Sequence, residues 1–313
     1  MALLFVACDP ALAPGAQLVL ALRLVCGLDV ADIALHLGIA TTAAAARLTR
    51  ARKALAAARP AFEVPAGPER DRRLPVVLDC VAGMFTVAHR TVLQPVDAAD
   101  DLGSSALSVA DALVAAYPTD TEVRGLRAVV RLGLARRPGR VDADGVAVAL
   151  DEADRSCWDA RLLRAGLADA TLAAEGAGRF ALEAALAGLH SAAPSAELTD
   201  WPLVVTLYEA LESVWGSPAV RVALLAARAQ VLLRGPGGPG REDDLTLVEA
   251  DLADVRDTGP AYARRDAGFA LVDLHWRTGR RAEAAREYAD LVVDVRSEPV
   301  RRFCLRRAGA AAD

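Results

Sequence analysis

Residues 29–58 read DVADIALHLGIATTAAAARLTRARKALAAA, two stretches with apolar residues at helical spacing on either side of Gly38-Ile39-Ala40. The spacing of three and four residues predicts helices over 29–37 and 41–58 that are joined by a tight turn, with Thr41 or Thr42 as cap of the second. The apolar faces that should meet are formed by Val30, Ile33, Ala34, Leu37 and Ile39 on one side and by Ala44, Leu48, Ala51 and Leu55 on the other. This pattern is typical of a helix-turn-helix.

The outward side of the second helix carries short and cationic side chains. A helix in a major groove needs short residues near the bases at its N-terminal end and cations farther along to reach phosphates. The residues that we expect to contact DNA are Thr41, Thr42, Arg47, Arg50, Arg52 and Lys53. The same stretch also fits an ordinary helical hairpin whose arginines are solvated.

Charge is divided unevenly along the 313 residues. The chain has 36 basic and 41 acidic residues, a net charge of −5 that excludes a bulk coat for nucleic acid. Residues 1–60 hold six basic and three acidic residues, a net charge of +3, which leaves −8 for the remainder. Because phosphate binding is electrostatic, this division favours DNA contact by the first segment and not by the second.

The rest of the chain is predicted to be helical, so the fold class is all-α. Aromatic residues make up only 4% of the chain, and alanine and leucine recur at helical spacings. We expect further helices over 15–26 and 69–93, and roughly nine more beyond. Helix breakers suggest a helix-turn-helix domain over 1–60, a linker and connecting helix over 61–103, and a helical-repeat domain over 104–313.

One junction in the third segment has tetratricopeptide-like spacing. Residues 274–288 predict a helix, a turn at Gly279 and a second helix with small residues toward the first. Ala284 would let the paired helices approach, and Tyr288 would fill the seam between them. A strict 34-residue period does not continue elsewhere, so the domain is interpreted as a degenerate helical repeat.

Several site classes are not expected. Arg23 interrupts the longest apolar stretch, so no membrane span is predicted. The five cysteines form no C-x-x-C pair, which favours a reduced, cytoplasmic setting in which they serve as core residues. The four histidines are scattered, and no Gly-rich phosphate loop or nucleophile elbow occurs. We therefore expect no metal, no cofactor and no catalytic residue.

A second group of residues could bind a polar ligand. Asp151, Asp154, Arg155 and Trp158 would lie near one face of a helix, where carboxylate, guanidinium and indole meet; a buried ion pair beside an aromatic plug is the alternative. Asp200 and Pro202 mark a helix start. The full set of candidate ligand residues is His89, Asp151, Asp154, Arg155, Trp158, His190 and Trp201.

A family resemblance covers nearly the whole chain. The segments that carry it include Cys8-Asp9-Pro10, Arg47-Leu-Thr-Arg50-Ala-Arg52-Lys53, Leu150-Asp-Glu-Ala-Asp154-Arg-Ser-Cys-Trp158-Asp159 and Gly279-Arg-Arg-Ala-Glu-Ala284-Ala. They resemble region four of extracytoplasmic-function (ECF) RNA polymerase sigma factors, in the subgroup with a long tetratricopeptide-like C-terminal extension. The resemblance implies DNA and the RNA polymerase core as partners.

The chain also departs from that family. It starts at Met1 essentially inside region four, so region two, which opens DNA in the family, is expected to be lacking. Residues 83–89 have lost the polar residues of a family motif. Thr41-Thr-Ala-Ala-Ala-Ala46 replaces the Glu- and Gln-bearing start of the recognition helix, and alanine cannot hydrogen-bond to a base edge. We expect weak DNA binding, either non-specific or at a −35-like site.

Three functions remain open from the sequence. The leading hypothesis is a sigma-factor-like transcription regulator lacking region two, with helix 41–58 on DNA and a protein partner on the helical extension. The alternative is a divergent paralogue that binds a small molecule, or acts as an unusual biosynthetic enzyme, between the helical blocks. The third is a pure interaction scaffold.

Overall fold

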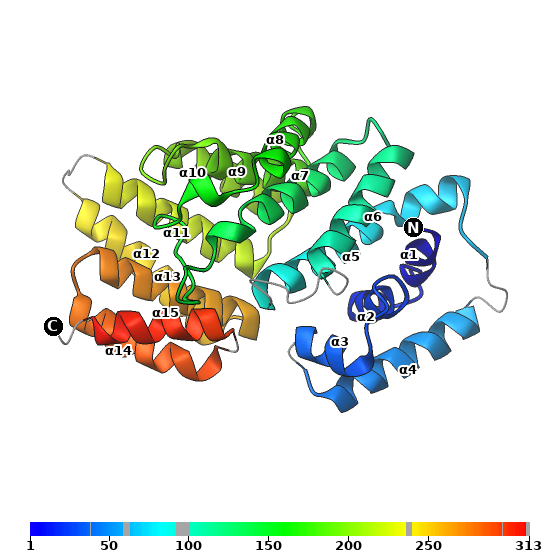
Figure 1. Cartoon of the computed structure of the whole chain (residues 1–313), viewed down its shortest axis with the longest axis horizontal. Coiled ribbons are helices and arrows are strands. Elements are labelled where there is room, and N and C mark those ends of the chain that lie inside the picture. Colours follow the sequence, from blue (N-terminus) through cyan, green and yellow to red (C-terminus); the bar gives the residue numbers. More distant parts are fainter. Residues whose placement is uncertain (38, 59–62, 92–100, 236–239, 296, 311–313) are drawn as a thin grey trace.

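The computed structural model describes residues 1–37, 39–58, 63–91, 101–235, 240–295 and 297–310 (Figure 1). These residues form fifteen α-helices, three short 3-10 helices and an isolated β-bridge between Val141 and Ala147, and they contain no strand. The expected all-α fold is confirmed. None of the described helices combines the length and the apolar character that crossing a bilayer requires.

The N-terminal helices are α1 (Ala2–Ala7), α2 (Pro14–Leu24), α3 (Val30–Leu37) and α4 (Thr41–Ala58). Ile33 on α3 and Leu48 on α4 are buried where the two helices meet, as the spacing predicts. The expected cap is wrong, because Thr41 is already helical and the amides of residues 43 and 44 donate to the carbonyl of Ala40. Helix α1 was not predicted. Gly38, which the sequence predicts to lie in the turn, is outside the described residues.

Helix α5 (Gly67–Thr91) joins the N-terminal helices to the rest of the molecule. Its Arg73 is 5% exposed, donates to the carbonyl of Phe5 at 2.9 Å, and pairs with Asp9 at 2.8 Å and Glu69 at 2.6 Å. One apolar core runs from Leu4 through α5 to Leu126 of α7 (Thr121–Ala135). The N-terminal helices therefore share a core with the helices that follow.

The remaining helices follow one another in antiparallel fashion and stack side by side (Figure 1). They are α6 (Leu102–Ala116), α7, α8 (Ala160–Ala173), α9 (Arg179–Ala192), α10 (Trp201–Val214), α11 (Pro218–Arg234), α12 (Arg241–Thr258), α13 (Ala261–Arg277), α14 (Arg281–Leu291) and α15 (Glu298–Gly309). Roughly nine were expected, and ten are present among the described residues. We call α6–α15 the helical extension.

The junction of α13 and α14 has the predicted form. Gly279 has φ +84 in the turn, where a side chain would be strained. Ala284 is fully buried, and Tyr288 is 3% exposed with its ring edge-on to Trp276 and to Phe303 at centroid distances of 6.1 and 5.8 Å. Small and aromatic residues thus close this helix pair as the spacing predicts, while the tetratricopeptide-like character of the whole extension stays a prediction.

Helix α7 is packed on several sides. A methyl group at Gly125 would lie 2.5 Å from the carbonyl carbon of Phe180, so only glycine allows this approach of α7 to α9. Glu122 accepts hydrogen bonds from the amides of Phe180 and Ala181, each at 3.0 Å, at the start of α9. The backbone of α9 is thereby anchored directly to α7.

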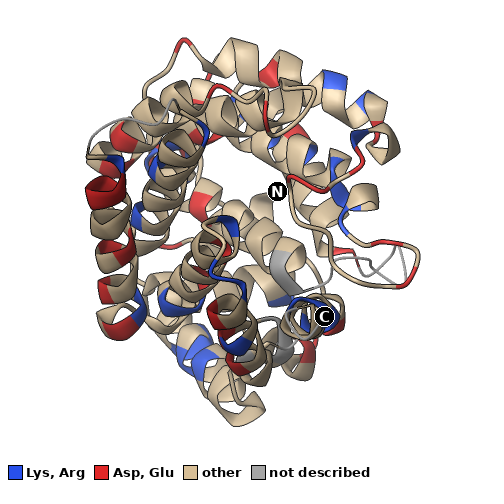
Figure 2. Cartoon of the chain, turned by 90° about the vertical axis from the view of Figure 1, so that its left-hand side faces the viewer, with Lys and Arg blue, Asp and Glu red and all other residues tan. Residues whose placement is uncertain are grey.

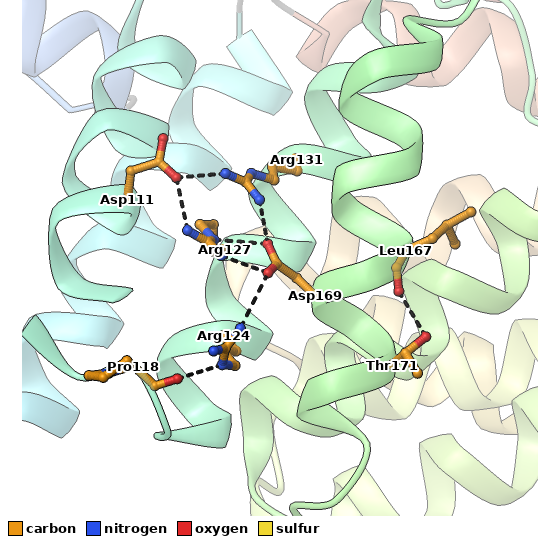
Figure 3. A network of polar contacts seen from close by, with 8 residues as sticks. All are labelled: Asp111, Pro118, Arg124, Arg127, Arg131, Leu167, Asp169 and Thr171. Atoms are coloured by element: carbon orange, nitrogen blue, oxygen red, sulfur yellow. Dashed lines mark hydrogen bonds and ion pairs between the residues drawn. The ribbon is translucent and has the colours of Figure 1, made fainter. Parts of the chain in front are cut away.

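A polar network joins α6, α7 and α8 (Figure 3). Asp169 on α8 is 3% exposed and accepts from Arg127 at 2.7 and 2.8 Å and from Arg131 at 2.8 Å. Both guanidinium groups also contact Asp111 on α6, at 3.2 and 2.8 Å. Arg124 lies 4.0 Å from Asp169. Two carboxylates thus neutralise arginines that line one face of α7.

The segment 140–159 is mostly a loop, so the predicted helical face of residues 151–158 is wrong. Only the 3-10 turn η2 (Arg155–Cys157) is helical among residues 151–158. Asp154 caps this turn, since its carboxylate accepts a hydrogen bond from the amide of Ser156 at 2.8 Å. The loop reaches the C-terminal helix: the amide of Ala147 donates to Pro299 at 2.9 Å, and Arg306 pairs with Asp142 at 3.1 Å. Cys157 in this loop is exposed, contrary to its expected place in the core.

Candidate functional site

Helix α4 presents a cationic face. Its apolar residues Ala44, Leu48 and Ala51 are at most 5% exposed and fix the helix against the core. All six residues expected to contact DNA are exposed: Thr41, Thr42, Arg47, Arg50, Arg52 and Lys53. Given 3.6 residues per turn, Thr42, Arg50 and Lys53 point most directly outward, with Arg47 on one flank and Arg52 on the other.

The charge on this face is not neutralised locally. Helix α4 contains four cations and no acidic residue. Within the described part of the chain, no carboxylate forms an ion pair with Arg47, Arg50, Arg52 or Lys53. By contrast, basic and acidic residues are interleaved on the end of the molecule that Figure 2 turns to the viewer. A helix face with several exposed cations suits a polyanion.

Four of the seven candidate ligand residues lie close together around the C-terminal end of α9. They are Arg155, Trp158, His190 and Trp201. Arg155 donates from Nη1 to the carbonyl of His190 at 2.7 Å and of Ala193 at 2.5 Å, and its guanidinium lies 4.9 Å from the ring centre of Trp158. The ring of His190 meets the ring of Trp201 edge-on at 5.4 Å. These contacts join the loop 140–159 to α9 and α10.

The other three lie apart. Asp151 pairs with Arg277 of α13 at 2.7 Å, and exposed Asp154 serves as the cap of η2. His89 is on α5, with its ring 5.3 Å from Phe85. Asp151 and Asp154 fail to join the group because the segment bends at η2 instead of continuing as a helix.

Two residues of this region were missed from the sequence, Arg136 at the end of α7 and Ser191 on α9. Burial lowers the pKa of Arg136, and the charge of Arg155 lowers it further. Burial, helped by Arg136 and Arg155, lowers the pKa of His190 to about 4. His190 is therefore neutral at pH 7, in a region where cations outnumber nearby carboxylates.

This neutral His190 leads to a pH prediction. In the unfolded chain its pKa is about 6.5, so above that pH neither state carries the proton. As the pH falls from 6.5 toward 4, His190 binds a proton in the unfolded state but stays neutral in the folded state. The free energy of unfolding therefore drops by about 2 kcal/mol. Urea unfolding of wild type and of His190→Gln at pH 7 and pH 4.5 measures this. The variant should lose less stability between the two pH values than wild type does; equal losses in the two proteins would contradict the assignment.

A cluster with metal-ligand residue types lies on α12–α14. Ligand atoms of His275, Glu283 and Glu287 lie within 4.8 Å of one another. Both ring nitrogens of His275 are already engaged, Nδ1 with Glu287 at 2.7 Å and Nε2 with Glu249 at 3.0 Å. Arg280 donates to Glu249 at 2.7 and 3.0 Å and is the main cause of the lowered pKa of that carboxyl. Both ring nitrogens of His275 thus face carboxylates of the protein, so the cluster is a polar network whose members contact one another.

Comparison with known proteins gives two family matches. Residues 6–55 match the model of sigma-70, region 4. Residues 73–174 match a family of unknown function, DUF6596. The first match covers α2, α3 and most of α4, and the second includes the network around Asp169, Arg136 and η2.

A curated relative is an uncharacterized protein of Rhizobium meliloti (strain 1021), which is 35% identical over 220 residues. The aligned part is 70% of this chain and 52% of the relative, so the chain spans about half of that protein's length. No solved structure matches the chain. Over its N-terminal helices, the chain is sigma-factor-like: it contains a helix-turn-helix that matches sigma-70 region 4.

Proposed function

We propose that the protein is a DNA-binding transcription regulator of the ECF sigma-factor type that docks α4 on DNA. The observation that carries this is the cationic face of α4, which lies within a segment that matches sigma-70 region 4. The arginines and Lys53 contact phosphates, and Thr41 and Thr42 supply the hydroxyl groups near the N-terminal end of the helix. Because alanines fill positions 43–46, base readout is poor and binding is weak, non-specific or −35-like.

The test is a triple variant, Arg47→Gln with Arg50→Gln and Lys53→Gln. Each lost phosphate contact reduces the slope of log K against log salt concentration by about one. The loss of three contacts weakens binding about a hundredfold at 0.1 M salt. Fluorescence anisotropy with a labelled duplex carrying a −35-like element, and with a scrambled duplex, at 50 to 200 mM salt measures both effects.

The control removes the same charge elsewhere. Arg161 and Arg164 on α8 and Arg286 on α14 are exposed, and their change to Gln alters the net charge equally. This control should bind DNA nearly as well as wild type. No binding by wild type at 50 mM salt, or equal losses in the two triple variants, would remove the DNA-binding proposal.

The helical extension is proposed to bind a protein partner, and the RNA polymerase core is proposed as a partner of the chain. Support comes from the sigma-like helix-turn-helix, since sigma region 4 acts on polymerase as well as on DNA. A pull-down with core polymerase, with and without promoter DNA, separates a sigma-like regulator from a pure scaffold. Such a regulator acts in the cytoplasm.

A second candidate function is small-molecule binding by the extension. It is favoured by the gathering of Arg155, Trp158, His190 and Trp201 around the end of α9. Aromatic rings and a guanidinium around a partly buried histidine are groups that recognise a polar ligand.

A further inference from the structure

Buried hydrogen-bond donors without acceptors are concentrated at one junction. Among the described residues, six shielded side-chain atoms have no hydrogen-bond partner, and four of these belong to Arg136, Arg155, Trp158 and Ser191. Arginine and indole nitrogens can only donate, and a serine hydroxyl can donate as well. Since buried polar groups are normally paired, the junction lacks an acceptor.

The four residues come from three elements that meet. Arg136 follows α7, Arg155 and Trp158 flank η2, and Ser191 is in the last turn of α9. The guanidinium of Arg155 lies over Trp158, and Arg155 is tied to the carbonyl of His190, the neighbour of Ser191. A methyl group at Gly139 would lie 2.9 Å from the indole nitrogen of Trp158, so the chain after α7 closes over that ring.

The junction also lacks negative charge. Arg136 forms no side-chain hydrogen bond or ion pair with any described residue. Arg155 and Arg140 donate to backbone carbonyls, Arg140 to His89 at 2.6 Å. Burial together with Arg136 and Arg137 lowers the pKa of Arg140 to about 10.

Other buried arginines of the molecule do have carboxylates. Arg137 pairs with Asp101 at 2.7 Å, and Arg127 with Asp169 at the same distance. The acid whose charge acts on Arg155 is Glu197, which is exposed and lies 3.8 Å from Arg234. A shielded guanidinium without a counter-charge is costly, so the retention of Arg136 at this junction calls for an anion.

We propose that Arg136, Arg155, Trp158 and Ser191 form an oxyanion site that takes a carboxylate or phosphate group of a small molecule. Oxyanions offer several acceptor atoms and the negative charge that two guanidinium groups require. A water molecule would satisfy donors but would leave the charge uncompensated. The shielding of the four donor atoms from solvent excludes a macromolecular surface as the ligand.

An open cavity shares Arg234 with the surroundings of Trp201, but its lining includes none of the four donor residues. Arg234 lies 5.7 Å from the ring centre of Trp201, and Trp201 adjoins His190 beside the proposed site. Arg234 and Glu197 line this cavity of about 420 Å³, whose lining further includes the carboxylates of Asp151 and Asp273 and Trp276, which is stacked against Arg281 at 3.8 Å.

The experiment measures thermal unfolding of the full chain with inorganic phosphate, sulfate, acetate or citrate at constant ionic strength, with sodium chloride as reference. An anion at a hundred times its Kd should raise the Tm of wild type by about 5 °C. In Arg136→Met the rise should disappear, and the Tm in chloride should exceed that of wild type because an uncompensated buried charge has been removed.

Three controls keep the outcome decisive. Arg164→Gln, an exposed arginine on α8, and the α4 triple variant should both respond to the anion like wild type. Trp158→Phe keeps an aromatic ring at this position but removes the indole N–H donor, so the affinity measured by calorimetry should fall about tenfold even if Arg136→Met fails to fold. No Tm rise with any of the four anions, or an equal rise in Arg136→Met, would overturn the proposal.

Discussion

Replacing Asp169 by Asn will lower the free energy of unfolding by about 3–5 kcal/mol, the usual cost of removing one partner of a buried ion pair. The Asp169 carboxylate is 3% exposed and faces Arg127, Arg131 and, at 4.0 Å, Arg124 (Figure 3). Without it, Arg127 and Arg131 would share Asp111, which is 46% exposed in its side chain, and Arg124 would lose its carboxylate at 4.0 Å. The remaining carboxylate is better solvated and cannot replace the lost contacts.

Urea unfolding followed by circular dichroism measures this loss. Glu175→Gln, at an exposed position just after α8, is the matched control and should change stability by less than about 0.5 kcal/mol. The stability loss of Asp111→Asn should lie between those of Asp169→Asn and Glu175→Gln, because the side chain of Asp111 is half exposed. If Asp169→Asn were as stable as the control, the network would contribute nothing to the packing of α6, α7 and α8.

Replacing Arg73 by Met will have a similar effect, about 3–5 kcal/mol, at the other end of the molecule. The side chain of Asp9 is 2% exposed, and Arg73 is its cationic partner at 2.8 Å. The carbonyl of Phe5 would lose its 2.9 Å hydrogen bond from Arg73 as well. Loss of both contacts weakens the attachment of α1 and α2 to α5, and therefore the seat of the DNA-binding helices.

The neighbouring Arg72→Met is the control, since Arg72 is exposed on the same helix turn. A double variant, Asp9→Asn with Arg73→Met, should recover part of the loss because the buried charge is removed together with its partner. Chemical denaturation gives the four stabilities. A double variant whose loss equals the sum of the single losses would show that Asp9 and Arg73 do not interact.

Elements that depend on local spacing were predictable. The helices expected over 15–26, 29–37 and 41–58 differ from α2, α3 and α4 by at most two residues at each end. Asp200 caps α10 as expected, with its carboxylate accepting from the amide of Leu203. Such features follow from periodicity and capping chemistry within a few residues. The predicted helix 69–93 also matches α5, except for 92–93, which lie outside the described residues.

Features that depend on distant contacts were not predictable. Arg136 and Ser191 are 55 positions apart and carry no motif, so only the packing of α7, η2 and α9 brings them together. The arginines of α7 at 124, 127 and 131 do share a helical face, which was a usable signal. It was hidden because nearly every cation of this chain is an arginine: of 36 basic residues, Lys53 alone is a lysine.

The candidate DNA face was predictable for the same local reason. Once Ala44, Leu48 and Ala51 are assigned to the core, helical geometry places Arg50 and Lys53 outside. What a helix face binds depends on groups that belong to another molecule. The identity of the partner and the domain boundaries near residues 60 and 104 therefore stay predictions.

The contacts between the loop 140–159 and α15 change how the extension responds to stress. In an open solenoid each repeat touches only its neighbours, so the last helix can fray without consequence for the middle. Here Arg302 and Arg306 bond to residues 158 and 164 positions away in the chain. Because of these long-range contacts, unfolding of α15 also breaks the hydrogen bonds that hold the loop carrying Arg155 and Trp158. The extension is thereby made slower to fold and more cooperative in its unfolding than its helix-by-helix sequence alone implies.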